Sequence, residues 1–147
     1  MRSTEKFNQE DLFGILNGRI STLINRDLYN RFRKANLGIT AEQWTILAIL
    51  WQKDKVTQQT LSDITLRDKP SITRLIDNLE KQNLVVRISD SSDRRVNLIY
   101  LTPKGIDLEK QASTIIDEVV NKILDEISND EILVCRNVLK KILNNLI

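Results

Sequence analysis

Apolar residues recur every three or four positions over most of the chain, which is the spacing of amphipathic helices. The longest patterns cover about residues 8–34 and 102–147, and the second is interrupted near Ser128. Shorter patterns begin after Thr40, Thr57 and Asp68. The sequence therefore predicts a mostly α-helical protein.

Local residue choices mark where these helices begin and end. The later helices are each preceded by a residue whose side chain can cap the first turn: Thr40, Thr57, Asp68, Thr102 and Ser128. Pro70 and Pro103 stand in first turns, where a missing N–H costs nothing. Residues 36–38 and Asn83 are expected to end helices, because Asn and Gly tolerate a left-handed backbone.

In the middle of the chain, apolar and polar residues alternate, which is the pattern of β-strands. Residues 84–89 and 94–101 have strand patterns, and residues 90–93 between them have the composition of a turn. A β-hairpin is therefore expected directly after two helices that a tight turn joins at residues 66–68. This order predicts a winged helix-turn-helix lobe at about residues 40–101.

The helix that begins after Asp68 carries a polar face suited to DNA. Its exposed positions are expected to be Lys69, Pro70, Ser71, Thr73, Arg74 and Asp77. Arg74 can bond a guanine edge or a phosphate, while Lys69 and Arg67 suit phosphates. Each residue alone also fits an ordinary solvated helix face. Their combination with a buried stripe and a basic hairpin favours a recognition helix in the major groove.

Three charged residues, Asp93, Arg94 and Arg95, form the expected tip of the hairpin. One interpretation is a plain charged turn. The other is that a carboxylate orients an arginine for insertion into a narrow minor groove. The residues alone fit both interpretations equally.

Composition narrows the classes of function. The chain has no His and a single Cys, and it lacks a glycine-rich phosphate loop. Nothing positive therefore points to an enzyme, a metal or a cofactor. The net charge is only +2, with a basic excess in residues 1–40 and 67–95, so a protein-interaction module without DNA binding stays open as the alternative. The single Cys, the polar start and the lack of a long apolar run predict a cytoplasmic protein without membrane contact.

The sequence resembles the MarR family of winged-helix transcriptional regulators. The resemblance rests on residues 72–81, on Leu84–Arg87, and on Asp93, Arg95, Leu101 and Thr102 of the wing signature, and it extends over nearly the whole chain. It implies that Arg95 and Arg94 enter the minor groove with Asp93 as orienter. The resemblance also covers the start of the helix at Thr57 and Gln58. The side chains of Thr57, Gln58 and Arg67 are expected to contact DNA phosphates. Two departures are Asn83, where these proteins usually have Gly, and Pro70, which removes an amide.

The resemblance also implies a homodimer built from terminal helices, at about residues 8–34 and 102–147 of a single domain that spans residues 1–147. The apolar stripes of residues 108–127 and 132–147 support this independently, because they are too broad for one small domain to cover. Two-fold symmetry predicts a palindromic operator in double-stranded DNA.

Family members commonly bind a small amphipathic or aromatic ligand that relieves repression. Phe13, Trp44 and Trp51 are candidates for such a cleft, although their helical spacing favours plain core residues. Cys135 lies among apolar neighbours, so a buried and inert thiol is expected.

Overall fold

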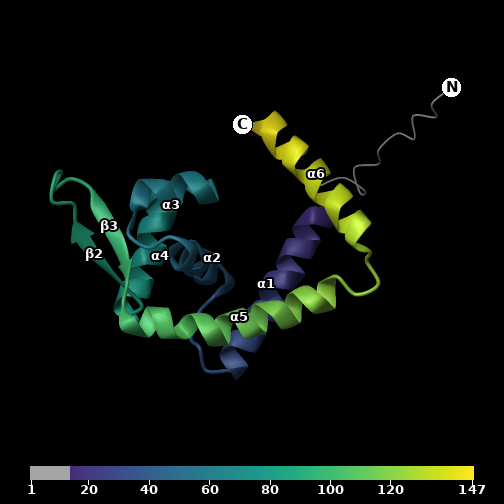
Figure 1. Ribbon diagram of the computed structural model, residues 1–147, viewed down its shortest axis with the longest axis horizontal. Coiled ribbons are helices and arrows are strands. Elements are labelled where there is room, and N and C mark those ends of the chain that lie inside the picture. The colour runs from purple at the N-terminus through teal and green to yellow at the C-terminus, as the bar shows by residue number, and fades with distance from the viewer. Residues whose placement is uncertain (1–13) are drawn as a thin grey trace.

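The computed structural model describes residues 14–147 as six helices and a small antiparallel sheet (Figure 1). The helices are α1 (Leu16–Lys34), α2 (Ala41–Gln52), α3 (Gln58–Thr65), α4 (Lys69–Lys81), α5 (Pro103–Ile123) and α6 (Asn129–Leu146). The strands are β1 (Val56–Thr57), β2 (Val85–Ser89) and β3 (Asn97–Leu101). The predicted fold class, mostly α with a winged helix-turn-helix, is confirmed.

The first helix begins later than the sequence predicts. Gly14 and Ile15 form a turn, and α1 starts at Leu16 rather than near Asn8. The part of the prediction that covers residues 8–13 lies outside the described residues.

The sheet has one strand more than the expected hairpin. Its order is β1-β3-β2, with Val56 opposite Ile99 and Val85 opposite Leu101. The additional strand is β1, and its Val56 is buried. A two-residue strand is too short to leave a period in the sequence. It closes the base of the wing against α3 and holds the hairpin to the lobe.

The predicted caps are confirmed. The Thr40 hydroxyl accepts a hydrogen bond from the Gln43 N–H, and the Gln43 side chain accepts one from the Thr40 N–H, at 3.1 and 3.0 Å. Thr57, Asp68, Thr102 and Ser128 cap the helices that follow them. Asn36 and Asn83 adopt left-handed conformations at φ 56° and 57°, as Asn tolerates. These devices fix where α4 begins and how the wing leaves it.

Packing joins the lobe to the long helices at its edge. The core contains fully buried side chains from α1, α2, α3, α4, β2 and β3: Phe32, Ile46, Leu47, Leu61, Ile76, Val85 and Ile99. Ion pairs join α1 to α5, from Arg31 to Glu118 at 2.8 Å and from Lys122 to Asp27 at 3.0 Å. The hydrogen bonds that Asp27 accepts from Lys122 and Arg31 lower the pKa of its carboxyl group.

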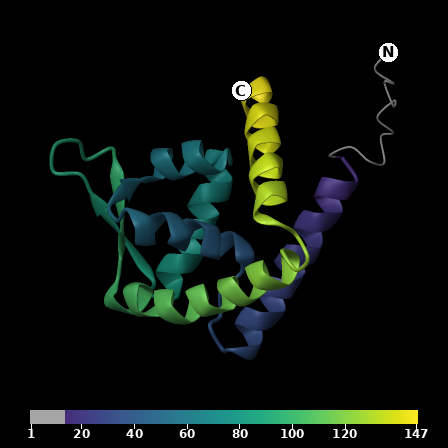
Figure 2. The same cartoon turned by 45° about the vertical axis from the view of Figure 1, so that its right-hand side comes forward.

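The terminal helices leave a large apolar surface uncovered. No residue of α6 is buried, and in both views this helix stands apart from the helices of the lobe (Figure 1 and Figure 2). The exposed apolar side chains of α1, α5 and α6 include Leu16, Ile20, Leu23, Val120, Ile123, Leu133, Val138, Leu139 and Leu143. Cys135 is exposed as well, so the expectation of a buried thiol is wrong for the single chain. Its apolar neighbours share the uncovered surface with it rather than enclosing it.

None of the helices within residues 14–147 has both the length and the apolar content needed to cross a membrane.

The turn between α3 and α4 contains a strained backbone position. Leu66 adopts φ 55° and ψ 27°, a left-handed conformation, with its side chain 65% exposed. We expect Leu66→Gly to raise the free energy of unfolding by about 1 kcal/mol, because glycine has no Cβ penalty there. Urea unfolding measures the change. Leu66→Ala is the matched control, since it removes the same side chain and keeps the strain. Equal stabilities of the two variants would contradict this prediction.

Candidate nucleic-acid interface

The start of α4 is built by its capping residue. The Asp68 carboxylate accepts a hydrogen bond of 2.7 Å from the Ser71 N–H, and this bond is the main cause of the lowered pKa of Asp68. The turn before it is held by Ser62, whose hydroxyl donates to the Arg67 carbonyl. The first turn of α4 is thereby fixed at the surface of the lobe, with Pro70 beside the cap.

The two faces of α4 differ as the sequence pattern predicts. Ile72, Leu75, Ile76 and Leu79 are buried in the core. Lys69, Pro70, Thr73 and Arg74 are exposed, and Ser71 and Asp77 are half-buried. A polar outer face therefore remains available over the N-terminal half of the helix, which is the part that a recognition helix presents to base edges.

The wing turn is organised by two carboxylates. Asp90 accepts hydrogen bonds from the backbone N–H and the hydroxyl of Ser92, and these lower the pKa of Asp90. Asp93 accepts a bond of 3.0 Å from the Arg95 N–H. No ion pair joins Asp93 to Arg94 or Arg95 anywhere in residues 14–147. Asp93 thus shapes the backbone of the turn and leaves both exposed guanidinium groups free to reach a ligand.

An open groove of about 690 Å³ lies between α3, α4 and the wing. It brings together six residues that the sequence singles out: Thr57, Gln58, Lys69, Thr73, Asp77 and Arg95. Thr57 caps α3, because its hydroxyl accepts from the Thr60 N–H at 3.0 Å. The groove therefore combines a hydroxyl-bearing helix face with a basic wing.

Three of the candidates outside this groove lie together on the other side of α4. Arg67, Ser71 and Arg74 line a second hollow of about 420 Å³ between α4 and the start of α2. Arg67 stands 3.7 Å from the Glu42 carboxylate. Basic groups therefore flank the exposed face of α4 on both sides.

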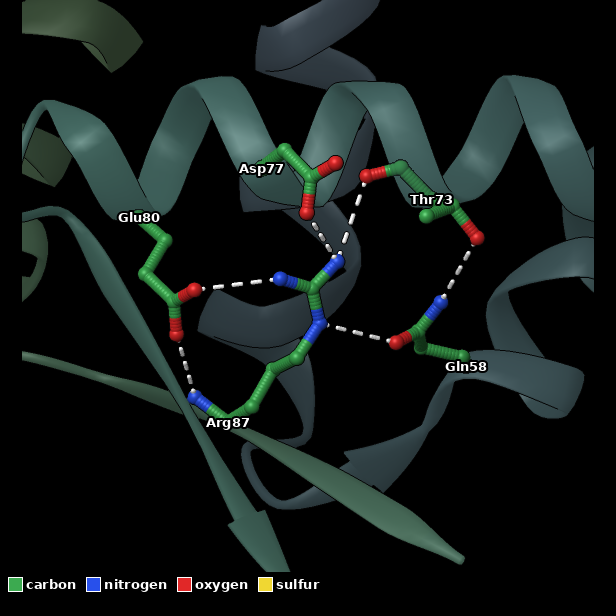
Figure 3. Close-up of polar contacts among 5 residues, drawn as sticks. All are labelled: Gln58, Thr73, Asp77, Glu80 and Arg87. Carbon is green, nitrogen blue, oxygen red and sulfur yellow. Dashed lines mark hydrogen bonds and ion pairs between the residues drawn. The ribbon is translucent and has the colours of Figure 1, made fainter.

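The floor of the main groove is made by a residue that the sequence reasoning missed. Arg87 of β2 is 19% exposed, and its guanidinium faces three acceptors on α4 and one on α3 (Figure 3). It bonds Asp77 Oδ1 at 2.7 Å, Glu80 Oε1 at 3.0 Å, the Thr73 carbonyl at 3.2 Å and Gln58 Oε1 at 2.9 Å. Glu80 also accepts from the Arg87 backbone N–H at 3.0 Å. Arg87 thus ties the wing to both helices of the helix-turn-helix.

The sequence contains a weak signal for this role. Arg87 is the only charged residue of β2, and it stands between the apolar residues Val86 and Ile88. In a strand, such a residue lies on the opposite face from its neighbours. Only the folded register shows that this face meets the carboxylates of α4.

The candidate ligand-cleft residues are partly accounted for by internal contacts. Trp51 is half-buried, and its indole N–H donates to the Gly105 carbonyl at 2.9 Å. Trp44 is half-buried against the core. Phe13 lies outside the described residues.

Known proteins match this chain in sequence and in structure. The family model described as the MarR family matches residues 39–96. The transcriptional regulator MhqR of Bacillus subtilis is 28% identical over 105 residues, covering 71% of this chain and 72% of that protein. FarR of Neisseria gonorrhoeae is 29% identical over 104 residues, covering 71% of each. The crystal structure of MepR of S. aureus in complex with DNA has a TM-score of 0.82 and is 29% identical, covering 95% of this chain and all of that one.

Proposed function

Because this chain belongs to the MarR family of transcriptional regulators, we propose that it is a dimeric repressor that binds a palindromic operator. One observation carries the proposal. The exposed N-terminal half of α4 and the wing with Arg95 line the same groove, with Lys69 and Thr73 on its helical side. This arrangement suits a helix in the major groove and an arginine in the adjacent minor groove. We propose that the protein acts in the cytoplasm, where the operator lies.

The similarity to MepR supports the DNA-binding part of this proposal. That protein was crystallised with DNA, and the two folds agree over 95% of this chain. An enzymatic role has no support, since the matched relatives are transcriptional regulators. The residues proposed to contact phosphates are Thr57 and Arg67, and those proposed for the wing are Arg94 and Arg95. The third phosphate candidate, Gln58, is instead bonded at both ends of its amide, to Arg87 and to Thr73.

The dimer part rests on the uncovered apolar surface of α1, α5 and α6. Leu133, Val138, Leu139 and Leu143 of α6 are each more than two-fifths exposed, which a folded protein in water rarely leaves uncovered over a whole helix. A second copy of the chain buries this surface across a two-fold axis. The operator then has inverted half-sites about 10 base pairs apart. Sedimentation equilibrium tests the dimer directly.

Arg95→Ala is expected to weaken operator binding about 30-fold, because it removes a cation proposed to enter the minor groove. The Asp93 bond to the Arg95 N–H uses only the backbone, so the turn keeps its shape in the variant. Fluorescence anisotropy with labelled operator measures the affinity. Lys110→Ala removes the same charge from the exposed middle of α5 and serves as the control. Equal affinities of the two variants would show that the wing does not take part in operator binding.

We further propose that a small aromatic or amphipathic ligand binds beside Trp44 and Trp51 and changes the spacing of the two reading heads. A mobility-shift assay with the DNA that flanks the gene, repeated with a panel of aromatic acids, tests DNA binding and ligand relief together. Failure to bind any DNA at low salt, with a stoichiometric protein partner in a pull-down, would instead favour the protein-interaction module.

A further inference from the structure

The orientation of the Gln58 side chain is fixed by its neighbour Arg87. The Nε of Arg87 can only donate a hydrogen bond, and it lies 2.9 Å from Gln58 Oε1. The oxygen end of the amide must therefore face Arg87. The amide nitrogen then faces Thr73, and Gln58 Nε2 donates to Thr73 Oγ1 at 3.3 Å (Figure 3).

Thr73 differs in this respect from four other threonines inside the helices. Thr22, Thr45, Thr65 and Thr114 each donate their hydroxyl proton to the carbonyl four residues earlier. Thr73 accepts from Gln58 instead, and no hydrogen bond within residues 14–147 has the Thr73 hydroxyl as its donor. Its side chain is exposed on the face of α4 that lines the groove. The proton is therefore available to a group that enters the groove.

We propose that Gln58 is a positioning residue that, held by Arg87, makes Thr73 a hydrogen-bond donor to an acceptor on a base edge. In the major groove such acceptors are the purine N7, guanine O6 and thymine O4. The exocyclic amino groups of cytosine and adenine offer a proton instead, so they do not satisfy a donor. The inference rests on the proposed DNA binding and adds to it a preference at one operator position.

Reversing the polarity of residue 58 tests this inference. Gln58→Glu has nearly the same shape, and its carboxylate still accepts from Arg87. Its second oxygen captures the Thr73 proton, which removes the donor from the groove. We expect Gln58→Glu to weaken binding to the selected operator about tenfold more than Gln59→Glu does. Gln59 lines the same groove, so it controls for the added charge.

A double-variant comparison separates polarity from charge. Thr73→Val is expected to lower operator affinity about tenfold, and Thr73→Ser to restore it. In the Thr73→Val background, Gln58→Glu should lower operator affinity no more than Gln59→Glu does. On random-sequence DNA of equal length Thr73→Val should have no effect, whereas a phosphate contact would weaken binding to both DNAs equally.

Three results would overturn the inference while leaving the proposed function intact. In the first, the fold losses of operator affinity from Gln58→Glu and Thr73→Val multiply in the double variant. In the second, Gln58→Glu and Gln59→Glu lower the affinity equally. In the third, Thr73→Val binds the operator with normal affinity. The third result does not involve a variant of Gln58, so it can be obtained even if Gln58→Glu does not fold. Urea unfolding shows whether Gln58→Glu is folded. A wild-type chain that selects no DNA sequence from a random pool would overturn both the inference and the proposed function.

Discussion

Gly105→Ala is expected to lower the free energy of unfolding by about 3 kcal/mol, because only at this glycine would an added Cβ overlap a backbone atom. A Cβ at this position would overlap the carbonyl oxygen of Leu84 and lie 3.2 Å from a methyl carbon of Leu101. The Leu84 and Gly105 backbones cannot easily move apart, because each carbonyl is held by a hydrogen bond. The Leu84 carbonyl accepts from the Thr102 N–H at 3.1 Å, and the Gly105 carbonyl accepts from Trp51.

This close approach joins the first turn of α5 to the end of α4 and the start of the wing. Thermal unfolding at one fixed protein concentration should show Tm lowered by roughly 10 °C. Ser113→Ala, on an exposed position of the same helix, controls for the added helix propensity and should leave Tm nearly unchanged. A Tm for Gly105→Ala within 2 °C of wild type, which is about the shift that 0.5–1 kcal/mol produces, would refute the close contact.

The parts of this fold that the sequence predicts well are those set by local chemistry. Thr40 with Gln43, Asp68 and Thr102 each place a side-chain acceptor three residues before a free N–H, and the structure contains those bonds. Asn83 takes the left-handed conformation expected of it. Such features depend on three or four neighbouring residues, so the sequence alone carries the information. The polar face of α4 follows in the same way from its period.

The parts that the sequence does not predict depend on partners far along the chain. Val56 forms a strand only because Ile99 lies opposite it, more than forty residues later. Arg87 reaches Gln58 and Glu80 only once β2 has packed beside α4. The same limit applies to Cys135. Apolar neighbours within a helix indicate burial, but whether anything covers them depends on a partner surface.

Arg87 provides the second prediction of large effect. Arg87→Met is expected to weaken operator binding more than about 100-fold. The change removes the cation that holds β2 against α4 and leaves the carboxylates of Asp77 and Glu80 without their partner. Asp77 lines the groove, so an unpaired negative charge would then face DNA phosphates. Rigid spacing between helix and wing is lost at the same time.

The cost to stability should be smaller than the cost to binding. Breaking a buried ion pair costs about 3–5 kcal/mol, but the two carboxylates are 47% and 40% exposed, so water compensates for much of that cost. We expect a loss of about 2 kcal/mol in urea unfolding, with a folded protein at 25 °C.

Two comparison variants separate loss of the network from damage to the strand. Ile88→Met places the same side chain on the next residue of β2, whose side chain is 45% exposed, and should bind operator normally. Arg87→Lys keeps the charge but has all its donors on one nitrogen, which cannot replace the three nitrogens that bond Gln58, Glu80 and Asp77. It should therefore bind better than Arg87→Met and worse than wild type. Wild-type affinity of Arg87→Lys would mean that charge alone matters and that the four-way bonding does not position α4. Wild-type affinity of Arg87→Met would mean that helix and wing read DNA without being tied together.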